Sequence, residues 1–238
     1  MTATKKIDWK NKLILAPLTK GGHVPFRKLC EHYGADITVS EMAYAFKLVK
    51  GDRREKALLR RTSEKGLFGV QLAAQKAPYA IHAAQMAMDS GADFIDLNCG
   101  CPIHDTVKRR MGSYLLKKPT QLGQLVERLV KSTDLPVTVK IRSGWDEDHI
   151  NALEVSKILE ESGAEAITIH GRTRSQRYSK SANWDLIRKV SEHVSIPVIG
   201  NGDILTYYEA NQRKERGQCS SLMIGRGALI KPWIFKEI

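Results

Sequence analysis

The sequence predicts an α/β protein folded as a (β/α)8 TIM barrel. Short apolar segments recur along the chain with helical patterns between them, and they lack the polar alternation of a half-exposed sheet. Such segments are typical of parallel strands covered by helices. The length of 238 residues suits one barrel. The eight predicted strands are 13–16, 37–40, 68–72, 94–97, 137–141, 166–169, 198–200 and 221–224.

The segments between these strands support the alternation. Residues 80–88 and 152–159 carry apolar side chains at helical spacing, and each segment is followed by a glycine–alanine pair before the next strand. A doubly wound open sheet is the alternative, but residues 16–19 read Ala-Pro-Leu-Thr where a dinucleotide-binding GxGxxG turn would stand. The barrel is therefore favoured, although residues 228–238 are short for a full closing helix.

The charge of the chain suggests a polyanionic partner. The formal net charge is +12, which favours either such a partner or simply a solvated basic surface. Three basic clusters follow predicted strands, and parallel strands would bring all three to one face of the barrel. The clusters are Lys50, Arg53 and Arg54; Lys108, Arg109 and Arg110; and Arg172, Arg174 and Arg177.

The four cysteines have neither CxxC spacing nor the density of a disulfide framework, so we expect no metal and a reducing compartment. No apolar stretch has the length of a membrane span, and no linker-like tract divides the chain. We expect a single domain over residues 1–238, a monomer without a membrane partner, in the cytoplasm and also in the nucleus.

One cysteine stands where chemistry is expected. In Asn98-Cys99-Gly100-Cys101-Pro102 the second thiol lies beyond the end of a predicted strand, which Pro102 prevents from continuing. Free cysteines are often inert and buried, and this is our interpretation of Cys99. The position of Cys101 instead favours a reactive thiol at the mouth of the barrel.

Polar residues at the ends of barrel strands converge on one mouth, where the active sites of such barrels lie. The glycine-containing turns after the seventh and eighth strands predict a phosphate site, although Asn-Gly is also an ordinary turn dipeptide. The strand-end residues are Gln71, Asn98, Cys101, Lys140, Arg142, His170, Asn201, Gly202, Asp203, Gly225 and Arg226.

Two cations alternate along one strand. Lys140 and Arg142 point to the same side of it, so they need either an anionic ligand or an internal salt bridge to a carboxylate such as Glu41 or Asp96. The lysine, together with Gln71 and His170, suits an electron-rich heterocycle that is hydrogen-bonded along one edge and stabilised when it carries negative charge. Flavin mononucleotide (FMN) meets this description.

Sequence motifs along essentially the whole chain resemble those of the tRNA-dihydrouridine synthases, and in detail those of the eukaryotic branch that modifies the tRNA variable loop. The motifs lie at 15–18, 34–36, 40–42, 69–72, 98–103, 139–142, 170–174, 176–178, 200–204 and 224–233.

This resemblance implies an FMN-linked barrel oxidoreductase that takes hydride from NADPH and reduces the C5–C6 bond of a uridine in tRNA. The implied roles fall into groups. By analogy, Pro17, Leu18 and Thr19 line the flavin; Gln71, Lys140 and His170 contact its ring system; Asn201, Gly202, Asp203, Gly225 and Arg226 hold its phosphate; and Asn98 orients the uracil.

Cys101 would protonate C5 of the uracil while hydride goes to C6. A free thiol is mostly protonated at neutral pH, which suits a general acid; a thiolate–imidazolium pair with His104 is the alternative. The uridine would flip into the mouth while basic residues hold the flanking phosphates. These substrate-binding residues are Arg142, Lys108, Arg109, Arg172, Arg174 and Arg177.

The chain also departs from the family pattern. Of the glycine-rich stretch after the cysteine only Gly112 is present, which affects how this loop closes. The C-terminal helical RNA-binding domain and N-terminal zinc fingers of family members have no counterpart in the sequence. Two further functions therefore stay open: a flavin barrel acting on free pyrimidines or other small molecules, and a non-catalytic RNA-binding remnant.

Overall fold

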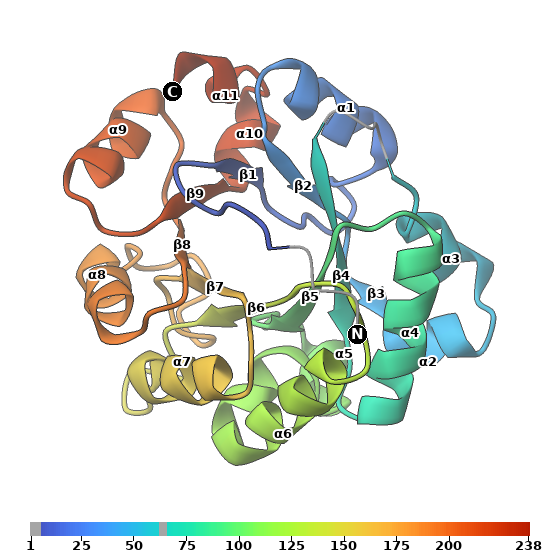
Figure 1. The fold of residues 1–238 in the computed structure, drawn as a ribbon. Coiled ribbons are helices and arrows are strands. Elements are labelled where there is room, and N and C mark those ends of the chain that lie inside the picture. Colours follow the sequence, from blue (N-terminus) through green and yellow to red (C-terminus); the bar gives the residue numbers. More distant parts are fainter. Residues whose placement is uncertain (1–5, 62–65) are drawn as a thin grey trace.

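The computed structural model describes residues 6–61 and 66–238, in which eight parallel strands close into a barrel (Figure 1). Strand β2 pairs with both β1 and β4, and β9 pairs with β1, so the ring has no open edge. All eight predicted strands are confirmed to within two residues at each end. The barrel strands are β1 (Leu13–Leu15), β2 (Ile37–Val39), β4 (Leu67–Ala73), β5 (Phe94–Cys99), β6 (Val137–Arg142), β7 (Ala166–His170), β8 (Val198–Asn201) and β9 (Ser221–Ile224).

Helices cover the outside of this ring (Figure 1). Of the two short helices after β9, the first buries Ala228 and the second buries Ile234 and Phe235, so together they cover the barrel where a full helix was not expected. The outer helices are α1 (Val24–His32), α4 (Ala77–Asp89), α6 (Pro119–Val130), α7 (Ala152–Glu161), α8 (Trp184–His193), α9 (Tyr207–Glu215), α10 (Arg226–Ile230) and α11 (Ile234–Glu237).

Five short elements were not predicted from the sequence. They lie between the barrel strands and build the rim around the C-terminal ends of β2, β4 and β5. These elements are β3 (Ala43–Tyr44), α2 (Ala45–Val49), α3 (Arg53–Leu58), α5 (His104–Lys108) and the 3-10 helix η1 (Gly112–Lys117).

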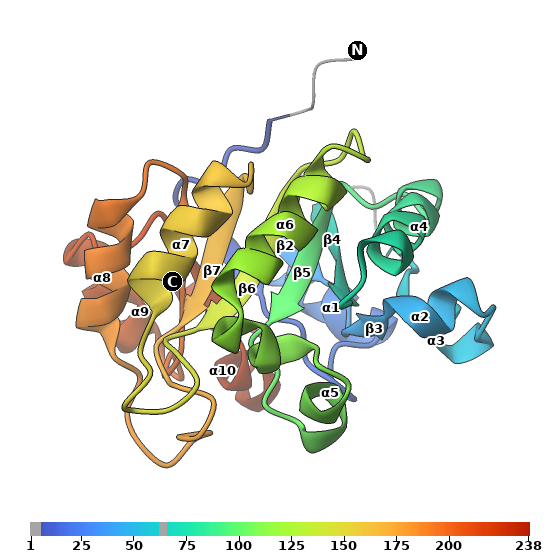
Figure 2. The same ribbon diagram turned by 90° about the horizontal axis from the view of Figure 1, so that it is seen from below.

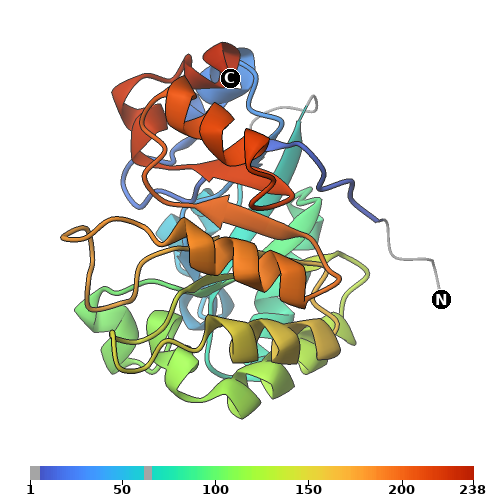
Figure 3. The ribbon, with the colours of Figure 1, turned by 90° about the vertical axis from the view of Figure 1, so that its left-hand side faces the viewer.

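One end of the barrel is sealed by the N-terminal segment. The Trp9 ring packs edge-on against Phe94 with the centroids 5.1 Å apart, and its indole N–H donates to Glu165 Oε1 at 3.0 Å. Apolar side chains from several strands fill the space around these rings. Figure 3 shows the N-terminal segment leaving from this end, with long loops at the other. In the part of the chain that the structure describes, this end of the barrel is thus filled by side chains.

The opposite end of the barrel is formed by the C-terminal ends of the strands. Figure 2 shows α5 and the loops that follow β6 and β7 extending beyond the sheet on this side, away from the N-terminus. Within the described ranges, none of the helices is long and apolar enough to cross a membrane.

Candidate active site

A cavity of about 470 Å³ opens at the C-terminal ends of the strands, within the usual size range of small-molecule sites. Residues from most of the barrel strands and the loops that follow them meet there. The lining includes fourteen residues predicted from the sequence: Pro17, Leu18, Thr19, Gln71, Asn98, Cys101, Lys140, Arg142, His170, Asn201, Gly202, Asp203, Gly225 and Arg226.

Asn98 holds the loop that carries the candidate catalytic thiol. Its Oδ1 accepts from the backbone N–H of Cys101 at 2.9 Å and of Gly100 at 3.3 Å. Its Nδ2 donates to Gln71 Oε1 at 2.8 Å. Both ends of the Asn98 amide are therefore engaged within the protein, and they fix the turn by which the chain leaves β5.

Asp96 lies one step deeper in the same network. Gln71 Nε2 donates to its Oδ2 at 2.6 Å, and the Thr138 hydroxyl donates to its Oδ1 at 2.8 Å. Burial raises the pKa of the Asp96 carboxyl to about 6, against the lowering effect of these two hydrogen bonds and of the Lys140 charge. A chain of side-chain contacts thus runs from Thr138 to the Cys101 loop.

Lys140 points across the cavity. Its Nζ donates to Asn201 Oδ1 at 3.0 Å, and Asn201 Nδ2 donates to the Met223 carbonyl at 2.8 Å. The hydrogen-bond partner of Lys140 is thus an amide, not the carboxylate considered from the sequence. Burial and, next, the nearby Arg142 charge lower the pKa of Lys140 to about 8, so it is still mostly protonated at neutral pH.

His170 is neutral at physiological pH. Burial, followed by the charges of Lys140 and Arg142, lowers the pKa of its imidazole well below the usual range. The Arg172 backbone N–H lies 3.2 Å from His170 Nδ1, which assigns the ring proton to Nε2. This leaves an N–H donor on the side of the ring that approaches Gly202.

The turn after β8 brings backbone close to the cavity. Gly202 has a φ of +121°, and a Cβ there would lie 2.7 Å from Ala182 Cβ. Asp203 lies 2.7 Å from Arg172 Nη1 and 3.0 Å from Arg226 Nη2. Burial would raise the pKa of Asp203, but the Ala182 N–H and the two guanidinium groups outweigh it and lower that pKa. Asp203 therefore holds two arginines, of which Arg226 lines the cavity.

The thiol of Cys101 faces a hydroxyl. Its Sγ lies 3.7 Å from Thr106 Oγ1, which is 2.8 Å from the Tyr44 hydroxyl. His104 is exposed at the start of α5, so its imidazole is not the group that meets the thiol. Cys99 is fully buried and burial raises its pKa well above the usual range, in keeping with a packing residue.

Arg142 is engaged by backbone carbonyls. Its Nε donates to the Gly100 carbonyl at 2.9 Å and its Nη1 to the Thr173 carbonyl at 2.8 Å. The pKa of the Arg142 guanidinium is lowered, and burial is the largest cause. The side chain thus ties the Cys101 loop to the loop after β7.

The other five residues predicted to bind substrate do not line this cavity. Arg172 is only 4 % exposed and faces Asp203. Arg174 stacks on Trp145, with its guanidinium 4.5 Å from the ring centroid. Lys108, Arg109 and Arg177 are exposed on the rim.

Several lining residues were missed from the sequence. Tyr178 is exposed on the loop after β7, and the Arg226 guanidinium lies 4.4 Å from its ring centroid. Its place shortly after a strand-end arginine cluster was the available signal. Among the apolar lining residues, Met42, Ile103 and Leu229 lie within the family motifs, whereas Leu205 and Met223 gave no signal in the sequence.

Comparison with known proteins identifies the family. The model of the dihydrouridine synthase (Dus) family matches residues 14–238. The chain belongs to this family. It is 44 % identical over 238 residues to the Arabidopsis thaliana "tRNA-dihydrouridine(47) synthase [NAD(P)(+)]-like", covering 98 % of this chain and 34 % of that protein. It is 41 % identical to "tRNA-dihydrouridine synthase B" of Pasteurella multocida, covering 95 % of this chain and 68 % of that protein.

A human relative named "tRNA-dihydrouridine(47) synthase [NAD(P)(+)]-like" is 40 % identical, over 98 % of this chain and 36 % of that protein. The chain thus spans about a third of the length of these eukaryotic relatives. Among solved structures, histamine dehydrogenase from Rhizobium sp. 4-9 superposes with a TM-score of 0.73 at 14 % identity, covering 99 % of this chain and 47 % of that one. This likeness supports the barrel fold alone.

Proposed function

We propose that this Dus-family chain reduces uridine to 5,6-dihydrouridine in tRNA, in the variable loop, using FMN and NADPH. The observation that carries the proposal is the mouth cavity. A thiol, a cationic lysine and a neutral imidazole donor converge there from Cys101, Lys140 and His170. The names of the relatives support tRNA as the substrate and a nicotinamide nucleotide as the reductant.

The cavity residues fit FMN. Lys140 would hold the negative charge of a reduced ring, while Gln71 and the His170 N–H would bond its polar edge. The Arg226 guanidinium and the turn at Gly202 would hold the phosphate. The available volume and this donor set suit a ligand with a flat ring and an anionic tail.

In the proposed reaction the C5–C6 double bond of uracil takes up one hydride and one proton. When bound, reduced FMN supplies the hydride to C6. Cys101 gives its thiol proton to C5, and the Asn98 contacts to the backbone keep that thiol at the end of β5. The thiolate left on Cys101 would take its next proton from water at the open mouth, with the Thr106 hydroxyl 3.7 Å away as its hydrogen-bond partner.

The uridine must leave its stacked environment to reach this mouth, since the reacting carbons lie inside the base. Basic side chains on the rim would hold the flanking phosphates, in keeping with the net charge of +12. The four cysteines are free, which supports a reducing compartment such as the cytoplasm or nucleus. We also propose that the chain acts as a monomer.

The test is mass spectrometry of tRNA incubated with the chain, FMN and NADPH. We expect dihydrouridine with the wild type and at least a hundredfold slower formation with Cys101→Ala, since general acid catalysis contributes roughly that much. Cys219→Ala removes another free thiol outside the cavity and serves as the control. Unchanged dihydrouridine formation by Cys101→Ala would refute the assignment of the proton donor.

The same preparation separates this function from the two alternatives. Flavin binding is followed by the absorbance of the purified protein. A protein that binds no flavin would support the non-catalytic RNA-binding function. Reoxidation of the NADPH-reduced protein by free uracil as fast as by tRNA would instead support a small-molecule oxidoreductase.

A further inference from the structure

A second cavity, of about 280 Å³, lies beside the mouth. It is formed by the C-terminal end of β4, helix α2, the start of α4 and the segment after α5, so elements far apart in the sequence share it. Among the residues that the structure describes, none of those lining it is acidic. The lining residues are Phe46, Lys50, Ala73, Ala74, Gln75, Lys76, Tyr79, Arg109 and Met111.

Three cations line this cavity. In residues 6–61 and 66–238, no ion pair joins Lys50, Lys76 or Arg109 to a carboxylate, although other lysines nearby are paired. The thirteen-residue helix α4 begins here without a side-chain cap, so its first N–H groups add partial positive charge. The cavity is therefore electropositive and suited to an anion.

Two aromatic side chains form part of its wall. Phe46 and Tyr79 are both half-buried, and the Arg109 guanidinium lies 5.2 Å from the Phe46 ring centroid. Aromatic faces bind bases by stacking, and clustered cations bind phosphate. A cavity with both features fits a nucleotide better than it fits a simple anion or an apolar ligand.

Segment 101–111 contributes to the walls of both cavities. Cys101 lines the first and Arg109 lines the second, on one continuous segment. Thr106, between them, is bonded to the Tyr44 hydroxyl, and Tyr44 directly precedes the helix that carries Phe46. A strand of RNA with one base in the mouth has its neighbouring nucleotides within reach of this wall.

We propose that the second cavity binds a nucleotide of the RNA next to the reacting uridine, with its base on Phe46 and its phosphate between Lys50, Lys76 and Arg109. This inference rests on the proposed function. The adenosine phosphate of NADPH presents the same chemistry, and the experiment therefore measures RNA and NADPH binding separately.

The first test is a double variant, Lys50→Ala with Lys76→Ala. We expect the Kd for unmodified tRNA to rise about tenfold and the slope of log K against log salt to fall by about 1, since the two substitutions together remove one phosphate contact. The matched control is Lys189→Ala with Lys214→Ala, which removes the same charge from exposed positions on α8 and α9. We expect less than a twofold effect from the control.

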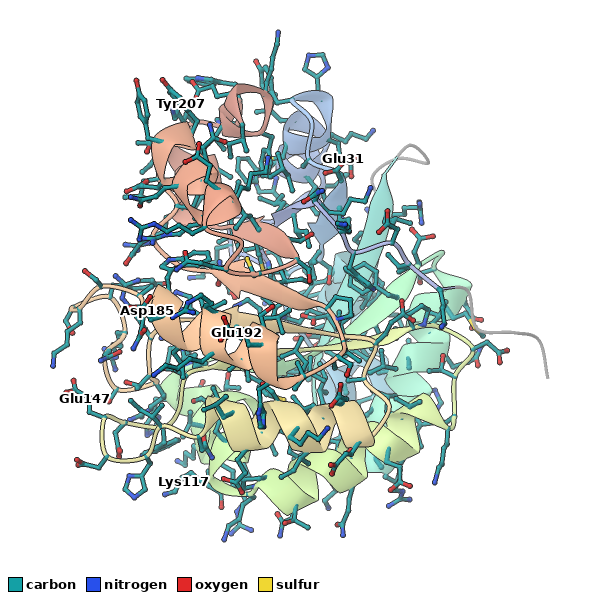
Figure 4. All side chains as sticks on the ribbon, turned by 60° about the vertical axis from the view of Figure 1, so that its left-hand side comes forward. Glu31, Lys117, Glu147, Asp185, Glu192 and Tyr207 are labelled. Carbon is teal, nitrogen blue, oxygen red and sulfur yellow. The ribbon has the colours of Figure 1, made fainter. Side chains whose placement is uncertain are left out.

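The control positions are remote from the proposed site. Figure 4 shows Asp185 and Glu192 on the outer side of the same helix α8, and Figure 1 places α8 and α9 across the barrel from α2 and α4. Equal weakening by the control pair would show that only net charge matters and would overturn the proposal.

The second test concerns the base. Phe46→Leu keeps an apolar side chain but removes the ring, and we expect it to bind tRNA at least fivefold more weakly than the wild type. Phe46→Tyr keeps the ring, and we expect it to bind tRNA as tightly as the wild type. Thermal unfolding of each variant checks the fold. Equal binding by the Leu and Tyr variants would overturn the stacking contact.

The NADPH arm uses flavin reduction without tRNA. We expect the KM for NADPH to be unchanged in the lysine double variant. A raised KM with unchanged tRNA affinity would assign the cavity to the reductant and overturn the proposal. A wild-type protein that forms no dihydrouridine would refute the proposed function. The tRNA affinities of the wild type and the variants could still be compared, because binding is measured without turnover.

Discussion

Thr106 joins two parts of the molecule through one buried hydroxyl. Its Oγ1 meets both Cys101 Sγ and the Tyr44 hydroxyl, and the residue itself has no exposed surface. A buried hydroxyl that loses its partner costs more than the bond contributes when it is made. The position therefore matters for stability as well as for the thiol.

We expect Thr106→Val to lower the free energy of unfolding by about 1–3 kcal/mol, because Tyr44 then loses the partner of its hydroxyl. Thr106→Ser keeps the oxygen and should recover most of that loss. Urea unfolding of both variants measures the difference. Destabilisation by Ser as large as that by Val would contradict this expectation, because Ser keeps the hydroxyl and loses only the γ-methyl.

Asp96 gives the stability of the barrel a defined pH dependence. Burial raises its pKa to about 6, above the ordinary value, so folding favours the protonated carboxyl. The stability it contributes is fully present below about pH 4 and is lost as pH rises through about 6. Asp96→Asn cannot titrate at this position.

We therefore expect the unfolding free energy of the wild type minus that of Asp96→Asn to fall between about pH 4 and pH 6 and to level above it. Taking the difference removes the contributions of the other carboxyl and imidazole groups. Denaturant unfolding at several pH values measures it. A difference that is flat, or that rises with pH, would contradict the assignment.

At the scale of elements, the loop after β5 depends on one glycine. Gly112 has a φ of +62°, and a Cβ there would lie 2.8 Å from both the Cys101 carbonyl and Thr106 Cγ2. The family has a glycine-rich stretch after the cysteine, and Gly112 is the glycine of that stretch that this chain contains. The backbone geometry requires it at this position, because a side chain would push the thiol loop away from η1.

We expect Gly112→Ala to destabilise the protein by about 2–4 kcal/mol, from left-handed strain together with overpacking. Gly51→Ala is the matched control, since Gly51 also has a positive φ of +81° but a Cβ there would meet nothing within 4 Å. The control should cost only about 1–2 kcal/mol. Urea unfolding measures stability, and the alkylation rate of Cys101 reports the displaced loop.

Equal unfolding free energies of the two alanine variants would show that the loop moves aside without cost. An unchanged alkylation rate in Gly112→Ala would show that the thiol keeps its place. Either result would contradict the close contact between Gly112 and Cys101.

At the scale of the whole molecule, the two ends of the barrel have different tasks. Trp9 and the residues around it seal the N-terminal end, while the mouth carries the cations and the thiol. The candidate active site therefore lies at the end of the barrel opposite to the Trp9 cluster, as is usual for this fold.

We expect Trp9→Ala to lower the free energy of unfolding by about 3–5 kcal/mol, since a buried ring and its packing on Phe94 are lost. Flavin affinity should be unchanged, because the cavity lies at the other end. Trp233→Ala is the control, because that ring is 47 % exposed and should cost less than half as much. A large loss of flavin affinity in folded Trp9→Ala would contradict this separation.

The sequence predicted the repeating elements well because buried parallel strands leave a strong pattern. It did not predict β3, α2 or α5, which are two to five residues long and carry too little apolar periodicity to be recognised. It placed Arg172 among the substrate contacts, whereas the fold buries it against Asp203, a residue far along the chain. Burial of a charge depends on such distant partners.

By itself, the sequence determined the barrel, the strand-end residues and the resemblance to the dihydrouridine synthases. Each of these follows from local patterns: strand periodicity, turn residues and short motifs. Only the tertiary structure decided the chain of contacts from Asp96 to Cys101, the hydrogen bond between the hydroxyl groups of Thr106 and Tyr44, and the second cavity. These depend on packing between segments tens of residues apart, and packing sets both the distances and the burial that shifts the pKa values.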